Sequence, residues 1–569
     1  MNILQFFKSD RKKKTLLVGV IILILGIIST FSFTYYADAE HPYTIVHSTL
    51  ESGDGTLIDS LIYTPVNPSP TCPGVVVGHG FCENKEYMQP LSIELVKRGF
   101  VVVNIDFRGH GSSGGYLSDF ARSNGLVLDM LAGVEYLENL GFVDRIGLAG
   151  HSMGGGTSML TALQNPTRIN ATVAIGALST FSSNSNISAI PNLLAAYTLY
   201  DQGITQEDAL DFLRAYTGQE NVEIGTLYGN FNNGDATKVA VSPNGEHLME
   251  PIDAIIINEA VQWFENAFNG APPTDVHLTV QYLIISLILS LFGLLLVLFS
   301  LIAFLGFYIF KGQQVHPQLA ENTGKFPIKP VLGYMLAAVI GFVLLIPFSI
   351  YFVDVAPITM FNSVFGGQAV GLACGVVVAL LMFSFKNRKF QFQTLSSGMK
   401  EMSSISPFHS LVYGVISGII CIIALMAVFD WSIVTSVPTT REVGVIFSLM
   451  ILLFPFFFLK EFYLRGYIQE RLKETGKIRE YITMVVIAIL IDIFIFIPVM
   501  MVGWQSVSLS FVALALTAVT LFTIFQQILV TWVYMNSGRN ILGSTVFYCI
   551  LFAWMVICFF PFGQPMMLF

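Results

Sequence analysis

The sequence predicts two joined parts, an α/β domain with a mostly parallel sheet and an all-α domain of membrane-spanning helices. Between about residues 40 and 275, short β-branched runs alternate with amphipathic stretches, the pattern of consecutive βαβ units. Long apolar runs flank this region on both sides. Over the whole chain 54% of residues are hydrophobic and only 12% are charged, against roughly 25% charged in soluble domains. Much of the chain is therefore expected to lie in lipid.

The N-terminal segment carries a basic cluster followed by an apolar run. Residues 1–14 hold five lysines and arginines, and residues 15–36 contain the apolar run Leu16 to Phe33, close to the ~20 residues that span a bilayer. This predicts a first transmembrane anchor with its N-terminus in the cytoplasm. A cleaved signal peptide is the alternative, because residues 37–39 (A-D-A) have the small-x-small form of a cleavage site. Under either interpretation, the region that follows is exported from the cytoplasm.

The C-terminal part, residues 278–569, predicts a polytopic membrane domain of about eight helices, nine with the anchor. Its apolar segments run over 278–310, 331–353, 363–385, 410–429, 443–459, 481–502, 508–535 and 542–561. With the N-terminus in the cytoplasm, each predicted span carries the chain to the other side of the membrane. In this arrangement Arg441 is the one basic residue in the short loops outside the cytoplasm. That bias predicts a multi-pass protein of the cell membrane with residues 40–275 extracytoplasmic. Basic residues form no nucleic-acid footprint.

Within the exported region, a serine follows one of the predicted strands. The strands are expected at 74–77, 100–105, 145–149, 172–177, 193–199 and 238–241, with helical patterns over 87–97 and 126–140 between them. Residues 150–154 (G-H-S-M-G) come directly after the third of these strands and begin a helix. This strand, turn and helix is the context of a nucleophile elbow, which lifts the hydroxyl of Ser152 clear of the sheet.

Two more motifs follow neighbouring strand ends. Residues 79–81 (H-G-F) follow the first predicted strand, and residues 106–114 (D-F-R-G-H-G-S-S-G) follow the next. Together with the serine motif, in this order and spacing, they resemble the α/β-hydrolase superfamily over the whole exported domain. The resemblance implies an α/β-hydrolase fold and a serine hydrolase. It also implies that Asp106 and His110 shape the site rather than take part in catalysis. The backbone amides of Phe81 and Met153 are expected to form the oxyanion hole.

A serine nucleophile needs a base, and the base needs an acid that fixes its tautomer. In this superfamily the chain order is serine, acid, histidine. His247 lies between the predicted strand 238–241 and a predicted helix over 252–268, where the family keeps its base. We choose Asp201 as the acid because it ends a buried strand and precedes a helix that Thr205 is expected to cap. The competing acids are Asp208, Asp211 and Asp235.

No cofactor or metal ion is expected in this domain, because neither a ligand cluster nor a phosphate-binding loop occurs in its sequence. A disulfide between Cys72 and Cys82 is conceivable outside the cell, but the strand expected between them would hold the two cysteines apart.

The membrane domain carries a second resemblance. Residues 460–467 (K-E-F-Y-L-R-G-Y), with residues 531–542 and Tyr548, are similar to the CAAX-protease and bacteriocin-processing (CPBP) family of intramembrane proteases. Lys460 replaces the first glutamate of that family's motif, and Tyr548 stands where its last histidine is expected. This domain is therefore expected to lack proteolytic activity. Glu461 and Arg465 are expected to form an ion pair one helical turn apart. Asp492 is expected to face protein or water rather than lipid.

Three classes of function remain open at the level of sequence. The leading one is a membrane-anchored serine hydrolase that cleaves ester, thioester or lipid acyl bonds through an acyl-serine, with a small-molecule or lipid substrate. A serine peptidase on the same fold would use the same residues. In the third class, the membrane domain is a transporter, a scaffold or an intramembrane-protease-like module, and the hydrolase domain is accessory. Transfer of the acyl group to an acceptor other than water is also open.

Overall fold

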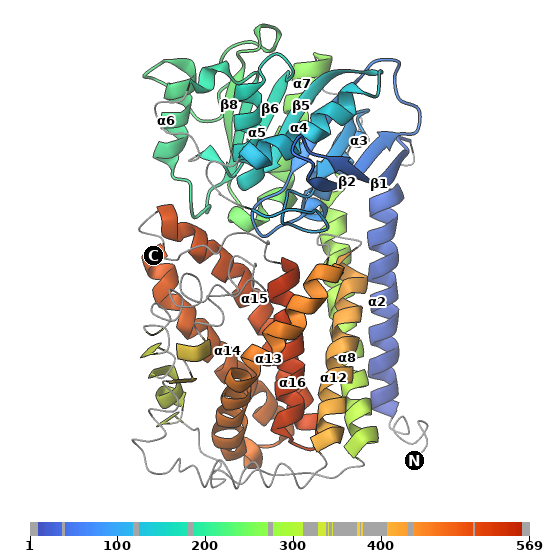
Figure 1. Ribbon diagram of the computed structural model, residues 1–569, viewed down its shortest axis with the longest axis vertical. Coiled ribbons are helices and arrows are strands. Elements are labelled where there is room, and N and C mark those ends of the chain that lie inside the picture. Colours follow the sequence, from blue (N-terminus) through green and yellow to red (C-terminus); the bar gives the residue numbers. More distant parts are fainter. Residues whose placement is uncertain are drawn as a thin grey trace.

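The computed structural model describes residues 10–36, 40–117, 124–178, 186–270, 277–310, 407–430, 436–503 and 507–559, with a few short stretches between 328 and 378. Figure 1 shows two parts stacked along the long axis of the molecule. One is the α/β domain, formed by the described residues between 40 and 270. The other is the helical bundle, formed by α2 and by the helices from α8 onward.

An eight-stranded sheet forms the centre of the α/β domain. Its strands are β1 (Tyr43–Glu51), β2 (Leu57–Pro65), β3 (Cys72–Gly78), β4 (Val101–Ile105), β5 (Val143–His151), β6 (Ala171–Ile175), β7 (Leu193–Thr198) and β8 (Thr237–Ser242). The spatial order is β1-β2-β4-β3-β5-β6-β7-β8. β2 pairs antiparallel with both of its neighbours, and β3 to β8 run parallel. This is the expected α/β-hydrolase fold.

Two faces of the sheet bury different residues, because successive side chains of a strand point to opposite sides. Val76 of β3 packs in the core under α4 (Asn124–Glu138), α5 (Met153–Gln164) and α6 (Gln206–Thr217). Val75 and Val77 pack in the core under α3 (Gln89–Val96) and α7 (Ala254–Asn269). Four short 3₁₀ turns complete the domain, η1 (Lys85–Met88), η3 (Ile187–Ala189), η4 (Phe231–Asn233) and η5 (His247–Ile252).

The six strands expected from the sequence correspond to β3 through β8. The edge hairpin of β1 and β2 was not predicted, because β1 is half exposed and carries polar residues throughout. Thr205 caps α6 as expected, accepting a hydrogen bond from the Asp208 amide. Cys72 and Cys82 are both free thiols, and they lie at opposite ends of β3, as expected.

The bundle consists of long apolar helices. They are α2 (Asp10–Tyr36), α8 (Val280–Phe310), α12 (Pro407–Phe429), α13 (Thr440–Tyr463), α14 (Lys477–Gly503), α15 (Val507–Asn536) and α16 (Ile541–Phe559), with the turns η8 (Leu464–Ile468) and η9 (Gln469–Thr475) between α13 and α14. Among the described residues, five helical segments are long and apolar enough to cross a membrane. The predicted spans at 331–353 and 363–385 lie largely outside the described residues, so the number of nine stays a prediction.

A buried polar contact joins the two parts. Glu94 on α3 accepts hydrogen bonds from the amide and the hydroxyl of Thr279, at 2.7 and 2.9 Å, just before α8 begins. The Lys97 ammonium donates to Glu94 at 2.9 Å and to the carbonyl of His277 at 2.8 Å. Glu94 and Lys97 are each only 1% exposed. The α/β domain is thereby bonded directly to the first helix of the C-terminal part.

Candidate active site

Ser152 occupies a strained turn between β5 and α5. Its φ angle is +51°, in the region that L-residues seldom adopt, at a cost of about 1–3 kcal/mol. Glycine is required around it: a Cβ on Gly150 would lie 2.3 Å from the carbonyl carbon of Gly154, and one on Gly154 would lie 2.3 Å from the carbonyl oxygen of Gly78. The elbow predicted from the G-H-S-M-G motif is therefore present, and Ser152 is half-buried at its tip.

Asp201 and His247 form a direct hydrogen bond. The distance from His247 Nδ1 to Asp201 Oδ2 is 2.6 Å, although 46 residues separate the two in sequence. Asp201 follows β7 and also accepts a hydrogen bond from the Gly203 amide at 2.6 Å. Burial favours the neutral acid, yet the hydrogen bond from His247 and its charge hold the pKa of Asp201 below the ordinary value. Asp201 thus remains an ionised partner for the imidazole.

The competing acids have other partners. Asp208 closes the capping box of α6 with Thr205, Asp211 pairs with Arg214 on the surface, and Asp235 accepts a hydrogen bond from the Asn230 amide.

The end of β6 links Ser152 to the region of His247. The Ser152 amide donates to the carbonyl of Ile175 at 2.7 Å. The next residue, Gly176, packs on the histidine so closely that an added Cβ would lie 2.8 Å from His247 Cε1. The ring of His151, which precedes the serine, lies 4.7 Å from the ring of His247, centroid to centroid. The ends of β5, β6 and β7 therefore converge on His247.

The two expected oxyanion donors lie on backbone segments that contact each other. Met153 is the first residue of α5, and the next residue, Gly154, lies so close to the loop after β3 that an added Cβ would be 2.3 and 2.7 Å from the carbonyl oxygens of Gly78 and His79. Phe81 lies two residues beyond His79, is 8% exposed, and belongs to the core under α4 and α5. This contact brings the loop that carries Phe81 to the N-terminus of α5, where helix amides favour negative charge.

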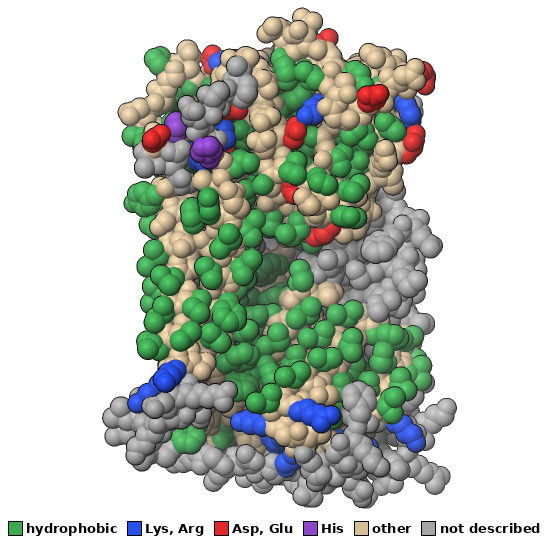
Figure 2. Space-filling model, turned by 180° about the vertical axis from the view of Figure 1, so that it is seen from behind, with side chains coloured by type: hydrophobic (Ala, Val, Ile, Leu, Met, Phe, Trp, Pro, Cys, Tyr) green, Lys and Arg blue, Asp and Glu red, His purple; other side chains and the backbone are tan. Residues whose placement is uncertain are grey.

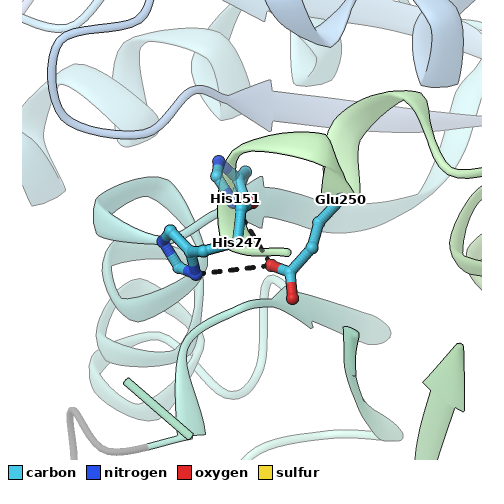
Figure 3. A group of neighbouring side chains, drawn as sticks. All are labelled: His151, His247 and Glu250. Carbon is cyan, nitrogen blue, oxygen red and sulfur yellow. Dashed lines mark hydrogen bonds and ion pairs between the residues drawn. The ribbon is translucent and has the colours of Figure 1, made fainter. Parts of the chain in front are cut away.

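Three further ionisable residues, which the sequence analysis did not identify, extend the site: His151 and Glu250 lie against His247, and Glu83 lies against His151. His151 lies between two carboxylates: its Nδ1 is 2.8 Å from Glu83 Oε1, and its Nε2 is 3.3 Å from Glu250 Oε2. Figure 3 shows Glu250 pointing toward both imidazole rings. We call Glu83, His151, Asp201, His247 and Glu250 the site cluster.

His151 is cationic at neutral pH. Complete burial disfavours the charge, but the carboxylates of Glu83 and Glu250 outweigh burial and raise the pKa of His151 to about 10. The charge and hydrogen bond of His151 also hold the pKa of Glu83 below its ordinary value, against the opposing effect of burial. A buried imidazole with a raised pKa thus lies next to Ser152 in the chain.

His151, His247 and Glu250 offer the donor atoms of a metal site, all within 4.8 Å of one another. Most of these donors already have protein partners. His151 Nδ1 contacts Glu83, its Nε2 lies 3.1 Å from the carbonyl of His247, and His247 Nδ1 contacts Asp201. A metal ion would have to displace these bonds, so the arrangement favours proton chemistry.

The loop after β4 plays the structural part that the resemblance implies. Asp106 accepts hydrogen bonds from the amide and the ammonium of Lys85, both at 2.7 Å, and from the Ser112 amide at 2.9 Å. Burial, with the neighbouring charge of His79, lowers the pKa of His110 to about 3, so His110 is neutral. These contacts tie the loops after β3 and β4 together under the site.

The catalytic end of the sheet faces the helical bundle. η5, which carries His247 and Glu250, contacts α8. Cys82, next to Phe81, packs against both the core of the α/β domain and the core of the bundle. In Figure 1 the loop after β3 and η5 lie on the side of the α/β domain nearest the bundle. The site therefore lies at the bundle end of the domain.

Polar residues are also buried inside the bundle. Lys460 Nζ lies 2.6 Å from Asp492 Oδ1 and 2.9 Å from the Tyr548 hydroxyl, and Gln527 Nε2 donates to Asp492 Oδ2 at 2.7 Å. We call these four residues the bundle cluster. Asp492 thus faces protein, as expected, and is hydrogen bonded within the bundle. Glu461 and Arg465 pair at 3.0 Å as expected, but both are fully buried.

The parallel sheet and the elbow give this part of the chain the α/β-hydrolase fold. Residues 70–202 match the sequence profile of a family described as "Serine aminopeptidase, S33". The mouse sn-1-specific diacylglycerol lipase ABHD11 is 36% identical over 116 residues, which cover 20% of this chain and 36% of the mouse protein. The chain thus spans about a third of the length of that relative.

Solved structures of esterases are also similar. Esterase Pf2001 of Pyrococcus furiosus is 18% identical, with a TM-score of 0.32, and the match covers 40% of this chain and 94% of the esterase. Est1E of Butyrivibrio proteoclasticus is 16% identical, with a TM-score of 0.31, and the match covers 39% of this chain and 99% of Est1E.

Proposed function

We propose that this protein is a membrane-anchored serine hydrolase that cleaves acyl esters of lipids through an acyl-serine at Ser152. The observation that carries the proposal is the 2.6 Å contact between Asp201 and His247 beside the strained serine elbow. A histidine held by a carboxylate beside a serine hydroxyl is the arrangement that activates a serine.

In the proposed mechanism, His247 removes the proton from the hydroxyl of Ser152 as the oxygen attacks the ester carbonyl. Asp201 holds the Nδ1–H of His247, which leaves Nε2 free to act as the base. The amides of Phe81 and Met153 stabilise the oxyanion, each contributing about 3 kcal/mol. His247 then protonates the leaving alcohol, and water releases the acyl group by the reverse sequence of proton transfers.

A lipid substrate is supported by where the site lies. The catalytic end of the sheet faces the bundle, and the buried contact of Glu94 and Lys97 with Thr279 and His277 fixes this orientation. Figure 2 shows a recess in the apolar surface of the bundle, below the α/β domain. An acyl chain can approach from lipid along such a surface. The mouse relative is named for its action on diacylglycerol.

The proposed orientation places the α/β domain outside the cytoplasm. Five described helices are apolar enough to cross a bilayer. In Figure 2, lysines and arginines gather at the end of the bundle away from the α/β domain. Basic residues favour the cytoplasmic side of a membrane, which supports this topology.

A serine peptidase is the second candidate, because the family profile matched by residues 70–202 is described as a serine aminopeptidase. Both candidates use the same nucleophile, base and acid. They differ in the bond that is cleaved, so a direct comparison of ester and amide substrates separates them.

The test uses the full-length protein in lipid nanodiscs, offered diacylglycerol, p-nitrophenyl acyl esters and peptidyl amides. We expect hydrolysis of the esters to exceed that of the amides and to disappear in Ser152→Ala. Ser188→Ala, which removes an exposed hydroxyl bonded to Asn186, should keep full activity. Ester hydrolysis that persists in Ser152→Ala would refute the proposed function. A preference for peptidyl amides would favour the peptidase.

A further inference from the structure

Glu83 and His151 contact each other beside the Asp201–His247 pair, and the proposed mechanism uses neither of them. His151 is the last residue of β5 and is 0% exposed. Its Nδ1 lies 2.8 Å from Oε1 of Glu83 and 3.0 Å from Oε2. Glu83 belongs to residues 79–83, which follow β3 and include Phe81. We call residues 79–83 the oxyanion loop. The contact between Glu83 and His151 therefore joins this loop to the strand end that precedes the serine.

Glu83 also holds the backbone of the oxyanion loop. Its Oε2 accepts a hydrogen bond from the Gly80 amide at 2.6 Å. A Cβ on Gly80 would lie 2.7 Å from Oε2 of Glu83 and 2.9 Å from Nδ1 of His151. The loop thus packs directly on both side chains, and any movement of either side chain displaces Gly80.

The orientation of the Phe81 amide depends on this part of the loop. The carbonyl of Gly80 and the N–H of Phe81 belong to one planar peptide unit. That carbonyl lies 2.7 Å from Nδ1 of His79, which carries the proton because Nε2 of His79 accepts a hydrogen bond from the Phe107 amide at 3.0 Å. The peptide unit that presents the proposed oxyanion donor is therefore bonded on its carbonyl side by His79, and Gly80 is bonded on its amide side by Glu83.

The other ring nitrogen of His151 contacts the segment that carries the base. Nε2 of His151 lies 3.1 Å from the carbonyl oxygen of His247 and 3.3 Å from Oε2 of Glu250. Glu250 in turn accepts a hydrogen bond through Oε1 from the Thr198 amide at 2.8 Å, at the end of β7 and three residues before Asp201. One buried network thus runs from the oxyanion loop through His151 to the backbone of the base and to the strand end before the acid.

The partners of His151 on both sides are acceptors. Carbonyl oxygens and ionised carboxylates offer no proton, and a neutral imidazole donates from only one of its nitrogens. Contacts of this kind on Nδ1 and Nε2 require the doubly protonated ring, in agreement with the raised pKa of His151. Hydrogen bonds from a cation are roughly twice as strong as neutral ones, which suits a residue that connects two separate segments.

We propose that His151, as an imidazolium paired with Glu83, is a positioning residue that holds the Phe81 amide and the His247 ring in the arrangement needed for attack by Ser152. This inference rests on the proposed function of the site. The oxyanion donor and the base act on the same ester group but lie on segments far apart in the sequence, and His151 is bonded toward both. A displacement of about 1 Å in such a site costs up to about 10²-fold in rate.

The test combines hydrolysis of a p-nitrophenyl ester with inhibition by a trifluoromethyl ketone, using the full-length protein in lipid nanodiscs. The hydroxyl oxygen of Ser152 adds to the ketone carbonyl, its proton passes to His247, and the oxyanion that forms mimics the transition state. The inhibition constant Ki therefore reports the placement of both groups. We expect Glu83→Ala and His151→Ala each to lower kcat about 10²-fold and to raise Ki by a similar factor, with KM within about threefold of wild type.

Glu83→Gln is the conservative variant, since its amide keeps an acceptor for Gly80 and a polar contact to the ring of His151. It should recover most of the activity and remain roughly fivefold below wild type in kcat and in affinity for the ketone, because a neutral bond replaces a charged one. The double variant Glu83→Ala/His151→Ala should lose little more than either single variant, since both changes break the same link.

Glu138→Ala is the matched control, because it removes a carboxylate paired with Arg168 on the surface of the same domain. It should keep the wild-type kcat and Ki. All rates are referred to the amount of folded protein, measured by size-exclusion chromatography and thermal unfolding. A residue that serves stability alone changes that amount and leaves the kcat and Ki of the folded molecules as in wild type.

Folded Glu83→Ala or His151→Ala protein with wild-type kcat and Ki would overturn the inference, and so would a lowered kcat with an unchanged Ki. If neither alanine variant folds, a wild-type Ki in Glu83→Gln would overturn it. Ser152→Ala in the same assay separates this inference from the proposed function. Hydrolysis that persists in Ser152→Ala removes the basis of both, whereas hydrolysis that is lost there but unchanged in the Glu83 and His151 variants rejects the positioning role alone.

Discussion

Two of the places where the molecule buries charge are the site cluster of the α/β domain and the bundle cluster. In the bundle cluster one cation meets one carboxylate, and both oxygens of Asp492 are bonded. In the site cluster three carboxyl groups share two imidazoles, His151 between Glu83 and Glu250, and His247 beside Asp201. Buried charge on its own therefore does not mark a catalytic centre.

The site cluster and the bundle cluster differ in the balance of positive and negative charge and in the residues that lie beside the charged groups. The bundle cluster is balanced, so its pair needs no proton exchange. The site cluster holds an excess of acid beside a half-buried serine in a strained turn, and groups with displaced pKa values in such a place favour catalysis. The following predictions test this contrast, from the largest expected effect to the smallest.

Asp201→Asn should have the largest effect on activity. The amide cannot hold His247 in the tautomer that the mechanism needs, so kcat for ester hydrolysis should fall about 10⁴-fold, with folding retained. Asp235→Asn is the matched control, because Asp235 accepts a backbone hydrogen bond elsewhere in the same domain. Equal activity in the two variants would remove Asp201 from the triad.

Lys460→Met should affect stability and leave ester hydrolysis intact. The change leaves the carboxylate of Asp492 buried without its cation, which costs about 3–5 kcal/mol. Thermal unfolding in detergent measures the loss. Combining it with Asp492→Leu should recover most of the stability, since neither charge then remains. Lys473→Met, at a partly exposed pair with Glu470, should have little effect. A loss of hydrolysis in folded Lys460→Met would contradict the separation of the clusters.

Gly176→Ala and Gly218→Ala form a matched pair at positive φ angles of +61° and +69°. Alanine costs about 1–2 kcal/mol at either position because of its backbone conformation. At Gly176 the added Cβ would also lie 2.2 Å from Glu250 Oε2, whereas nothing lies within 4 Å at Gly218. We expect Gly176→Ala to lose more stability than Gly218→Ala and to reduce kcat at least tenfold. Equal stability and equal kcat in the two variants would mean that the side chains of the site cluster can move without loss of function.

The cationic form of His151 gives the smallest expected effect, a change in how stability depends on pH. Its pKa is raised from an unfolded value near 6.5 to about 10, so its contribution is complete below pH 6.5 and is lost as the pH rises through about 10. Chemical denaturation at pH 7 and pH 9.5 should show a larger loss of stability in the wild type than in His151→Gln. Parallel losses would indicate that His151 is neutral.

Much of the fold and part of the site could be predicted from the sequence. Ser152 is recognisable because its motif includes the glycines that the turn needs. Asp201 and His247 follow from chain order, and their hydrogen bond agrees with that choice. Chain order predicts the members of a triad, but it does not predict which other side chains surround them.

Glu83, His151 and Glu250 were missed for this reason. His151 occupies a variable position of the serine motif, and the residues that contact it are 68 and 99 positions away. In the bundle, the local spacing of Glu461 and Arg465 predicted their pair, whereas the pairing of Lys460 with Asp492 requires knowledge of which helices are neighbours. Burial could not be predicted for either pair.

The most direct test of the account is to locate the covalent adduct of a fluorophosphonate on the full-length protein by peptide mass spectrometry. The account predicts one adduct, on Ser152, which is absent in Ser152→Ala and forms far more slowly in His247→Ala. An adduct on a different residue, or none at all in a protein that still hydrolyses esters, would contradict it.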